Sequence, residues 1–429
     1  MSSKRKRGGD DRHFLNNLSE SEVSFDKAVV MKELDSLVEL ISTQAPPSTQ
    51  DDPYAYTGLA GQAEMFLRLH LKHPLGNRSE PTKCPFLTTG MKYLLAALDI
   101  VKNKKSVRIS YIIGQSSVYA LLAVFHSLLG SKGESKKFVQ HILKMQADAV
   151  KAEESEMLYG KSGYLYTLLF LAKHLDVRKE VAPVVAKVCR AIVEDGVDEA
   201  AECGVDGVSL MWKWHGHYLG AAHGVNGILF MLLQAHSRGL GELTDTHLSL
   251  IHKQIQFLVT QCVMSSGNYK CKLEDDLDDD ALVHWCHGCV GMVFLLSKAF
   301  EVFEKSKPSS SAGAEDSKSA GGEYLQKAQA AADVVWRRGL LKKGLGLCHG
   351  ISGNGYTFLT LYRLTKEQKY LNRALQFVNF SLDWGKLTKS GIVQPDAPYS
   401  LFEGLAGAVC YFLDVCVSPA ESLFPAFEL

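Results

Sequence analysis

Short apolar runs recur along this chain, and each of them follows a Gly-x-x-Gly motif. Two examples are Tyr164–Phe170 and Ile228–Leu233, in which nearly every side chain is hydrophobic. A helix that is apolar on all sides is buried in the interior of a protein. The segments between the runs are amphipathic, as in His247–Cys262, where apolar residues step by three and four positions along one helix face. The pattern therefore predicts pairs of helices, one buried and one on the outside.

The Gly-x-x-Gly motif occurs six times, and a seventh, degenerate copy begins at Gly114. The leading glycines are 46 to 64 residues apart, at Gly58, Gly114, Gly160, Gly224, Gly288, Gly350 and Gly404. Self-similarity at a near-regular period indicates a repeat architecture, and strand signals are sparse. We therefore expect an all-α fold, an α/α toroid in which seven inner helices are enclosed by an outer ring. The glycines would let the N-termini of the inner helices approach one another closely.

The repeats run through most of the chain and predict one domain over residues 12–429. Residues 1–11 are charged and contain glycine, which predicts a disordered basic tail. Within this tail, Lys4–Arg7 is either a solvated segment or a nuclear-import patch. Residues 305–322 are rich in Ser, Ala, Gly and Lys and predict a flexible insert between two helices.

Charge and composition exclude several classes of protein. The chain has 47 Lys and Arg against 47 Asp and Glu, so no overall field attracts nucleic acid or an acidic membrane. Its apolar stretches are too short or too interrupted for a transmembrane helix, and its first residues lack the apolar core of a secretory signal. Ten irregularly spaced cysteines in such a chain do not indicate a disulfide framework. We expect a cytoplasmic protein, with nuclear or peripheral membrane association left open.

Candidate chemistry gathers at one end of the predicted ring. We call the end formed by the N-termini of the inner helices the rim. The residue directly before each leading glycine should lie there, which places the following residues together: Thr57, Ile113, Tyr159, His223, His287, His349 and Glu403. One place earlier, repeats five and six carry Cys286 and Cys348. Because neighbouring repeats are neighbours in space, two cysteines and three histidines should converge on the rim.

Thiolate and imidazole are ligands that zinc prefers. We predict one zinc ion held by Cys286, Cys348 and His349, with His287 beside the metal as a catalytic or supporting group. Three protein ligands leave a fourth position open, which is typical of a catalytic site. Helix N-termini favour the thiolate form. The competing interpretation is a pair of core cysteines beside unrelated histidines, but two Cys-His pairs in register in adjacent repeats disfavour it.

At these residues the chain resembles the LanC-like proteins, eukaryotic relatives of the bacterial LanC lanthionine cyclases. The resemblance spans nearly the whole chain from Arg12 onward, and it is carried by Gly220–Gly224, His284–Gly288, Leu340–Gly350, Tyr399–Gly404 and Phe424–Leu429. It implies an α/α barrel with one zinc bound by two cysteines and one histidine. It also implies that glutathione binds at the zinc and is added to dehydroalanine or dehydrobutyrine residues of damaged proteins, whereas the bacterial enzymes form a thioether within one peptide.

The resemblance further implies roles for single residues. His223 matches an acid–base histidine of the family, and Glu156 stands at the position of the cyclases' catalytic aspartate. That replacement, and His287 where the bacterial enzymes commonly have tyrosine, put cyclase activity in doubt and fit the eukaryotic branch. Glutathione contacts of the family would fall on Lys343 and Arg12. Independently of the resemblance, His223 and His287 suit the protonation of an α-carbon, because an imidazole titrates near the working pH.

Two alternatives share parts of this pattern. A non-catalytic scaffold that binds zinc and glutathione and recruits signalling proteins would use every one of the same ligands, so the sequence leaves it open. Other α/α toroids include prenyltransferase-like zinc enzymes and glycosidases. A glycosidase needs two facing carboxylates, and the rim offers only Glu403, with Glu156 nearby.

Overall fold

The computed structural model describes residues 12–76, 84–305, 322–382 and 392–429. The expected basic tail at 1–11 and residues 306–321 of the expected insert lie outside the described residues. In the described part the secondary structure is helical, with isolated β-bridges in place of strands. No helix in that part is long and apolar enough to cross a membrane.

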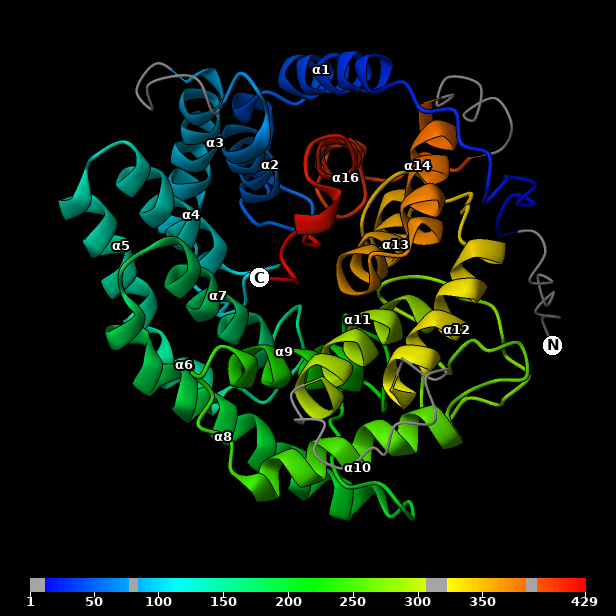
Figure 1. Ribbon diagram of the computed structural model, residues 1–429. Coiled ribbons are helices and arrows are strands. Elements are labelled where there is room, and N and C mark those ends of the chain that lie inside the picture. Colours follow the sequence, from blue (N-terminus) through cyan, green and yellow to red (C-terminus); the bar gives the residue numbers. More distant parts are fainter. Residues whose placement is uncertain (1–11, 77–83, 306–321, 383–391) are drawn as a thin grey trace, which may run out of the picture.

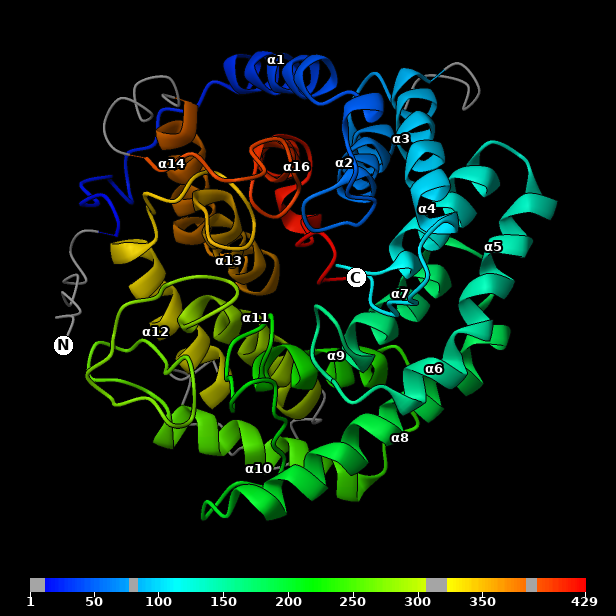
Figure 2. The same ribbon diagram turned by 180° about the vertical axis from the view of Figure 1, so that it is seen from behind.

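The apolar runs form an inner ring of helices (Figures 1 and 2). Each of them begins directly after a leading glycine, which caps its N-terminus. In the described residues these inner helices are α2 (Leu59–Lys72), α4 (Gln115–Leu128), α7 (Lys161–His174), α9 (Val225–Ser237), α11 (Cys289–Ala299), α13 (Ile351–Thr365) and α16 (Leu405–Val417). The predicted toroid, including its degenerate second repeat, is confirmed.

An outer layer of amphipathic helices encloses this ring (Figure 1). It consists of α1 (Lys27–Gln44), α3 (Pro85–Lys102), α5 (Lys132–Lys144), α6 (Gln146–Lys151), α8 (Arg178–Cys203), α10 (Asp245–Gln261), α12 (Glu323–Arg338) and α14 (Gln368–Leu382). Most outer helices follow the inner helix that they cover. A different arrangement is seen for α1, which packs on α16, so the N-terminal helix covers the last inner helix. Short turns η2 (Pro47–Thr49) and η6 (Pro419–Glu421) and a π-helical turn η4 (Phe300–Glu304) accompany these helices.

The second glycine of most motifs lets neighbouring repeats touch. A methyl group on Gly163 of α7 would lie 2.6 Å from the Cβ of Ser110, which belongs to the preceding repeat. Gly61 of α2 faces Leu401 of the last repeat in the same way, at 2.8 Å between the two Cβ positions. Contacts this short exclude any side chain larger than hydrogen. The ring therefore closes where α2 meets α16, and glycine is required at the junctions.

The centre of the ring is filled by side chains. The chain's last described segment enters it (Figure 1), and there Phe427 stacks on Phe230 with 4.4 Å between ring centroids. Phe424 stacks on Trp285 at 5.6 Å. All four rings are buried, so the centre of the toroid is packed. Trp285 directly precedes Cys286 and therefore connects this core to the rim.

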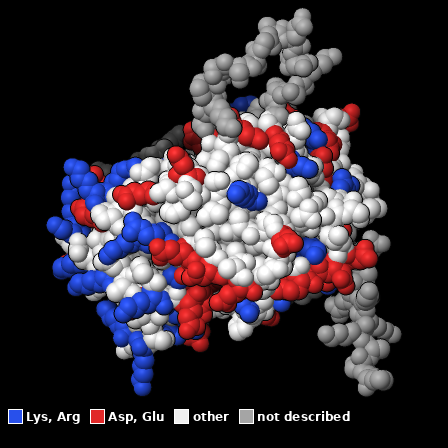
Figure 3. Space-filling view, turned by 90° about the horizontal axis from the view of Figure 1, so that it is seen from below, with Lys and Arg blue, Asp and Glu red and all other residues white. Residues whose placement is uncertain are grey.

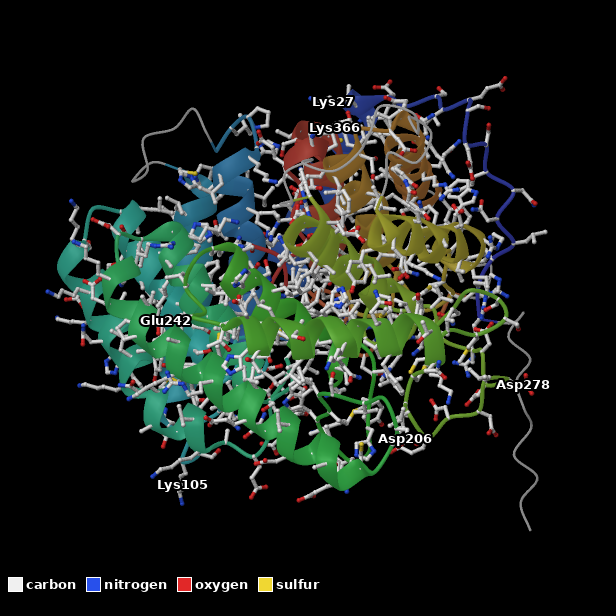
Figure 4. The ribbon with its side chains drawn as sticks, turned by 60° about the horizontal axis from the view of Figure 1, so that its bottom comes forward. Lys27, Lys105, Asp206, Glu242, Asp278 and Lys366 are labelled. Carbon is white, nitrogen blue, oxygen red and sulfur yellow. The ribbon has the colours of Figure 1, made fainter. Side chains whose placement is uncertain are left out.

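The loops that precede the inner helices lie at the rim end. Figure 4 shows Lys105, Asp206 and Asp278 of these loops toward the bottom of the view, whereas Lys366, which caps the C-terminus of α13, lies at the top. Acidic side chains form a band across the face that is lowest in Figure 1, and basic ones gather at one side of it (Figure 3). The balanced total charge of the chain therefore conceals local segregation.

Candidate functional site

The three predicted metal ligands meet at the rim. One atom from each of Cys286, Cys348 and His349 lies within 4.8 Å of the other two. Backbone hydrogen bonds between adjacent repeats fix this arrangement: the amide of Cys286 donates to the carbonyl of Cys348 at 3.4 Å, and the amide of Cys348 donates to that of Phe402 at 2.8 Å. The ladder runs from repeat five through six to seven, so each ligand is held by the next repeat.

The donor set fits a zinc ion. Zinc bonds of about 2.0–2.3 Å in a tetrahedron place ligand atoms roughly 3.5 Å apart, and the observed separations of up to 4.8 Å need only small side-chain adjustments. Cys286 and Cys348 are 8% and 3% exposed. All ten cysteines lie in the described residues and none forms a disulfide, so both thiols are available as ligands.

The pKa values of the two thiols shift in opposite directions, in part because Cys286 donates a hydrogen bond to Cys348. Burial disfavours the thiolate of Cys348, but hydrogen bonds from Cys286, His349 and Tyr56 outweigh burial, so the pKa of Cys348 lies well below its usual range. The hydrogen bond to Cys348 and then burial raise the pKa of Cys286. The site thus concentrates negative charge on sulfur, which is the form that binds a metal cation.

Beside the ligands, His223 and Glu156 form a pair. Nδ1 of His223 lies 2.9 Å from a carboxylate oxygen of Glu156. Glu156 is 2% exposed and His223 is 15% exposed. The carboxylate also accepts hydrogen bonds from the backbone amides of Leu158, at 2.9 Å, and Tyr159. Because a carboxylate on Nδ1 fixes the orientation of the ring, the pair has the arrangement of a positioned acid or base.

His287 lies in a different environment. Burial lowers its pKa to about 4, although the charge of Cys348 opposes this shift. Its Nδ1 is buried and has no hydrogen-bond partner among the described residues. Burial without a carboxylate partner therefore favours the neutral imidazole of His287, and its role as a proton donor stays a prediction.

The structure brings Arg12 and Lys343 to the same side of the rim. The amide of Lys342 donates to the carbonyl of Arg12 at 3.0 Å, so the N-terminal segment runs alongside the loop before Cys348. Lys343 is exposed, and Nε of Arg12 is buried without a partner among the described residues. Burial lowers the pKa of His284 well below its usual range, and the positive charges of Lys343 and, more weakly, of Arg12 lower it further.

Two of the other rim residues lie beside this site. Burial raises the pKa of Glu403, while the nearby charge of His349 lowers this pKa and that of Cys348 raises it. Tyr159 is 40% exposed and stacks on Trp214 with 5.8 Å between ring centroids.

Sequence reasoning missed several site residues. The hydroxyl of Tyr56 hydrogen-bonds to Cys348, and burial and the two cysteines raise its pKa. Nδ1 of His284 lies 3.9 Å from the sulfur of Cys286. A signal for Tyr56 was present, because it stands two places before its leading glycine, as Cys286 and Cys348 do.

Most of the chain matches one known protein family. The model of the family described as lanthionine synthetase C-like protein matches residues 49–429. The chain belongs to this family. The predicted relationship is thereby confirmed, and the match covers the whole ring from the first repeat to the last.

Proteins of an animal and of a plant are among the relatives of this LanC-like chain. It is 33% identical over 405 residues to a protein of Danio rerio named glutathione S-transferase LANCL1, covering 93% of this chain and 91% of that one. It is 29% identical over 395 residues to the LanC-like protein GCL1 of Arabidopsis thaliana, covering 88% and 82%. Among solved structures, a nisin cyclase superposes with a TM-score of 0.65 over 90% of this chain and 93% of that one at 14% identity, which shows the shared toroid.

Proposed function

We propose that this LanC-like protein adds glutathione to dehydroalanine or dehydrobutyrine residues of proteins or peptides, with a zinc ion at Cys286, Cys348 and His349. The observation that carries the proposal is the placement of the His223–Glu156 pair on the same rim as a Cys₂His cluster. The relative named as a glutathione S-transferase supports glutathione as the thiol.

The three ligands would hold zinc with an open fourth position. A zinc ion there would supply a site at which an incoming thiol is kept deprotonated near neutral pH. Cys286, whose thiol pKa is raised, would lose its proton on binding a metal as a thiolate beside Cys348. The resulting charge on the two sulfurs keeps a third sulfur electron-rich and hence nucleophilic.

The addition forms a bond between sulfur and the β-carbon and breaks the carbon–carbon π bond. The electron pair moves onto the α-carbon and its carbonyl, and one proton must be delivered to the α-carbon. His223 is placed for this role because Glu156 accepts a hydrogen bond from its Nδ1–H group and fixes the orientation of the ring. Its Nε2 has no hydrogen bond to any described residue and is available to donate. The proton lost by the thiol goes to solvent, from which His223 is recharged.

Lys343 and Arg12 would bind the carboxylates of glutathione. Both are cationic and act electrostatically on His284, next to the metal ligands. Glutathione carries two carboxylates, so two cationic side chains on the same side of the thiol-binding position suit its charge.

The alternative enzyme classes fit less well. Glu156 already accepts hydrogen bonds from His223 and two backbone amides, so it does not supply the free member of a glycosidase's carboxylate pair. A binding scaffold without catalysis would share the ligands, and only turnover distinguishes it.

The proposal is tested by incubating the zinc-loaded protein with glutathione and a dehydroalanine peptide and following the thioether adduct by mass spectrometry. His223→Ala should retain zinc and helical content and should slow addition by about 10²–10⁴-fold, the usual contribution of a positioned acid or base. A wild-type rate equal to that of glutathione alone would refute catalysis and leave the scaffold.

A further inference from the structure

An indole covers one face of the His223 imidazole. The rings of Trp214 and His223 are parallel within 2°, with centroids 3.8 Å apart. Tyr218 lies at the side, with its ring centroid 6.0 Å from His223 and 5.5 Å from His287. With Glu156 on Nδ1, the imidazole is held at one edge and across one face.

The chain makes a tight turn to place this indole. The amides of Trp214 and Tyr218 both donate to the carbonyl of Gly216, at 3.0 and 3.2 Å. Gly216 has a φ of 129°, and His215 has a φ of 49°, a left-handed conformation that is uncommon for a residue other than glycine. A strained residue persists only where its surroundings over-determine it, and such residues cluster at functional sites.

The turn is fastened at its far side as well. Nε2 of His217 lies 2.7 Å from Glu199 of α8, and Nδ1 lies 2.5 Å from Glu274. The amide of Leu273 donates to the carbonyl of His217 at 2.9 Å. The turn is therefore fixed both to the outer layer and to the neighbouring loop, which makes it a rigid support for Trp214.

We propose that Trp214 is a positioning residue for His223. Its stack prevents the imidazole from rotating about the side-chain bonds, so that with Glu156 on Nδ1 the ring has one orientation and Nε2 one direction. This inference rests on the proposed function, because it assigns Trp214 to the proton donor of that reaction. Trp214 acts through His223 and need not touch either substrate.

The expected effect follows from the geometry of proton transfer. Without the stack, Glu156 alone leaves the ring free to pivot about the Nδ1 hydrogen bond. A displacement of about 1 Å at a reacting group costs up to roughly 100-fold in rate. We therefore expect Trp214→Leu to lower kcat by about 10- to 100-fold while the KM for each substrate changes little. Phenylalanine still offers a ring face, so Trp214→Phe should recover most of the loss.

The test combines a spectroscopic and a kinetic measurement on full-length zinc-loaded protein labelled at histidine. His223 is assigned by comparison with His223→Ala, and its carbon-bound ring protons should lie upfield because they face the indole. Trp214→Leu should move them downfield, and Trp214→Phe should keep most of the upfield shift. Lys213→Ala, in the same turn and exposed, is the matched control and should change neither the spectrum nor the rate.

The two measurements separate the possible failures. An unchanged His223 spectrum in Trp214→Leu overturns the positioning role, whether or not the protein adds glutathione. A downfield shift with an unchanged kcat, or a loss confined to KM, also overturns it, since the stack would then be idle or Trp214 would be a substrate contact. If wild-type protein shows the stacked spectrum without any turnover, the proposed function fails while the Trp214–His223 contact stands.

Discussion

Gly353 of α13 packs against Leu347, the residue before two of the proposed zinc ligands, and replacing it by alanine should damage both the fold and the proposed metal site. A Cβ at this position would lie 1.8 Å from the carbonyl oxygen of Leu347, and Cβ atoms essentially never come within 3.0 Å of such an atom. The helix and the loop must therefore separate by at least the difference, 1.2 Å. Leu347 directly precedes Cys348, so the movement is passed to a ligand.

Two opposing contributions set the magnitude. Forcing a methyl group into a packed contact costs about 1–3 kcal/mol, and more when backbone has to move. Alanine in a helix recovers about 0.5–1 kcal/mol relative to glycine. We expect a net loss of roughly 1–2 kcal/mol in the free energy of unfolding. Displacing the ligand should also weaken zinc binding by about 10- to 100-fold, the usual effect of disturbing the support of a metal ligand.

Chemical denaturation and competition with a zinc chelator measure the two effects. Gly133→Ala in α5 is the matched control, because a Cβ there meets nothing within 4 Å, and it should stabilise the protein by about 0.5–1 kcal/mol. Gly163→Ala, whose Cβ would lie 2.4 Å from Met157, should destabilise the ring without weakening zinc. The reasoning is refuted if Gly353→Ala is as stable as wild type and binds zinc equally well.

Three further changes test the roles of single side chains. Glu156→Gln removes the charge that supports His223, so kcat should fall by about 10- to 100-fold, equivalent to a charge-assisted hydrogen bond of about 1.5–3 kcal/mol, with zinc content unchanged by metal analysis. Lys343→Ala should raise the KM for glutathione by about 3- to 5-fold in steady-state kinetics, because an exposed ion pair is worth up to about 1 kcal/mol. Burial opposes ionisation of Asp280, but hydrogen bonds that include Arg338 hold its pKa below 3.8. The ionised side chain therefore stabilises the fold above that pH, and this stabilisation is lost as the pH falls through the lower pKa of the folded state. Asp280→Asn should therefore be less stable than wild type by about 1 kcal/mol at pH 7, and the difference measured by denaturation should vanish in strong acid.

The ring and its group of two cysteines and one histidine could be predicted because both depend on a repeating local pattern. Each leading glycine marks an inner-helix N-terminus, so residues at one register position must share one end of the molecule. That argument alone predicts that Cys286, Cys348 and His349 lie together. It also placed His223 beside them, since it precedes the glycine of the adjacent repeat.

Contacts made by loops were beyond the same argument. Trp214 reaches His223 through a turn with left-handed residues, and no periodicity encodes where such a turn directs its side chain. The packing of α1 on α16 joins segments more than 350 residues apart, which a repeat pattern read along the chain does not reveal. The neutral state of His287 depends on burial, a property of the finished fold.

The most direct test of the central claim measures zinc content and glutathione addition on the same protein preparations. Wild type should carry one zinc per chain and convert a dehydroalanine peptide to its glutathione adduct much faster than glutathione alone. Cys286→Ala should lose most of the zinc and the activity together, whereas Cys189→Ala, a buried cysteine of the outer helix α8, should keep both. Retention of zinc and of adduct formation in Cys286→Ala would contradict the account.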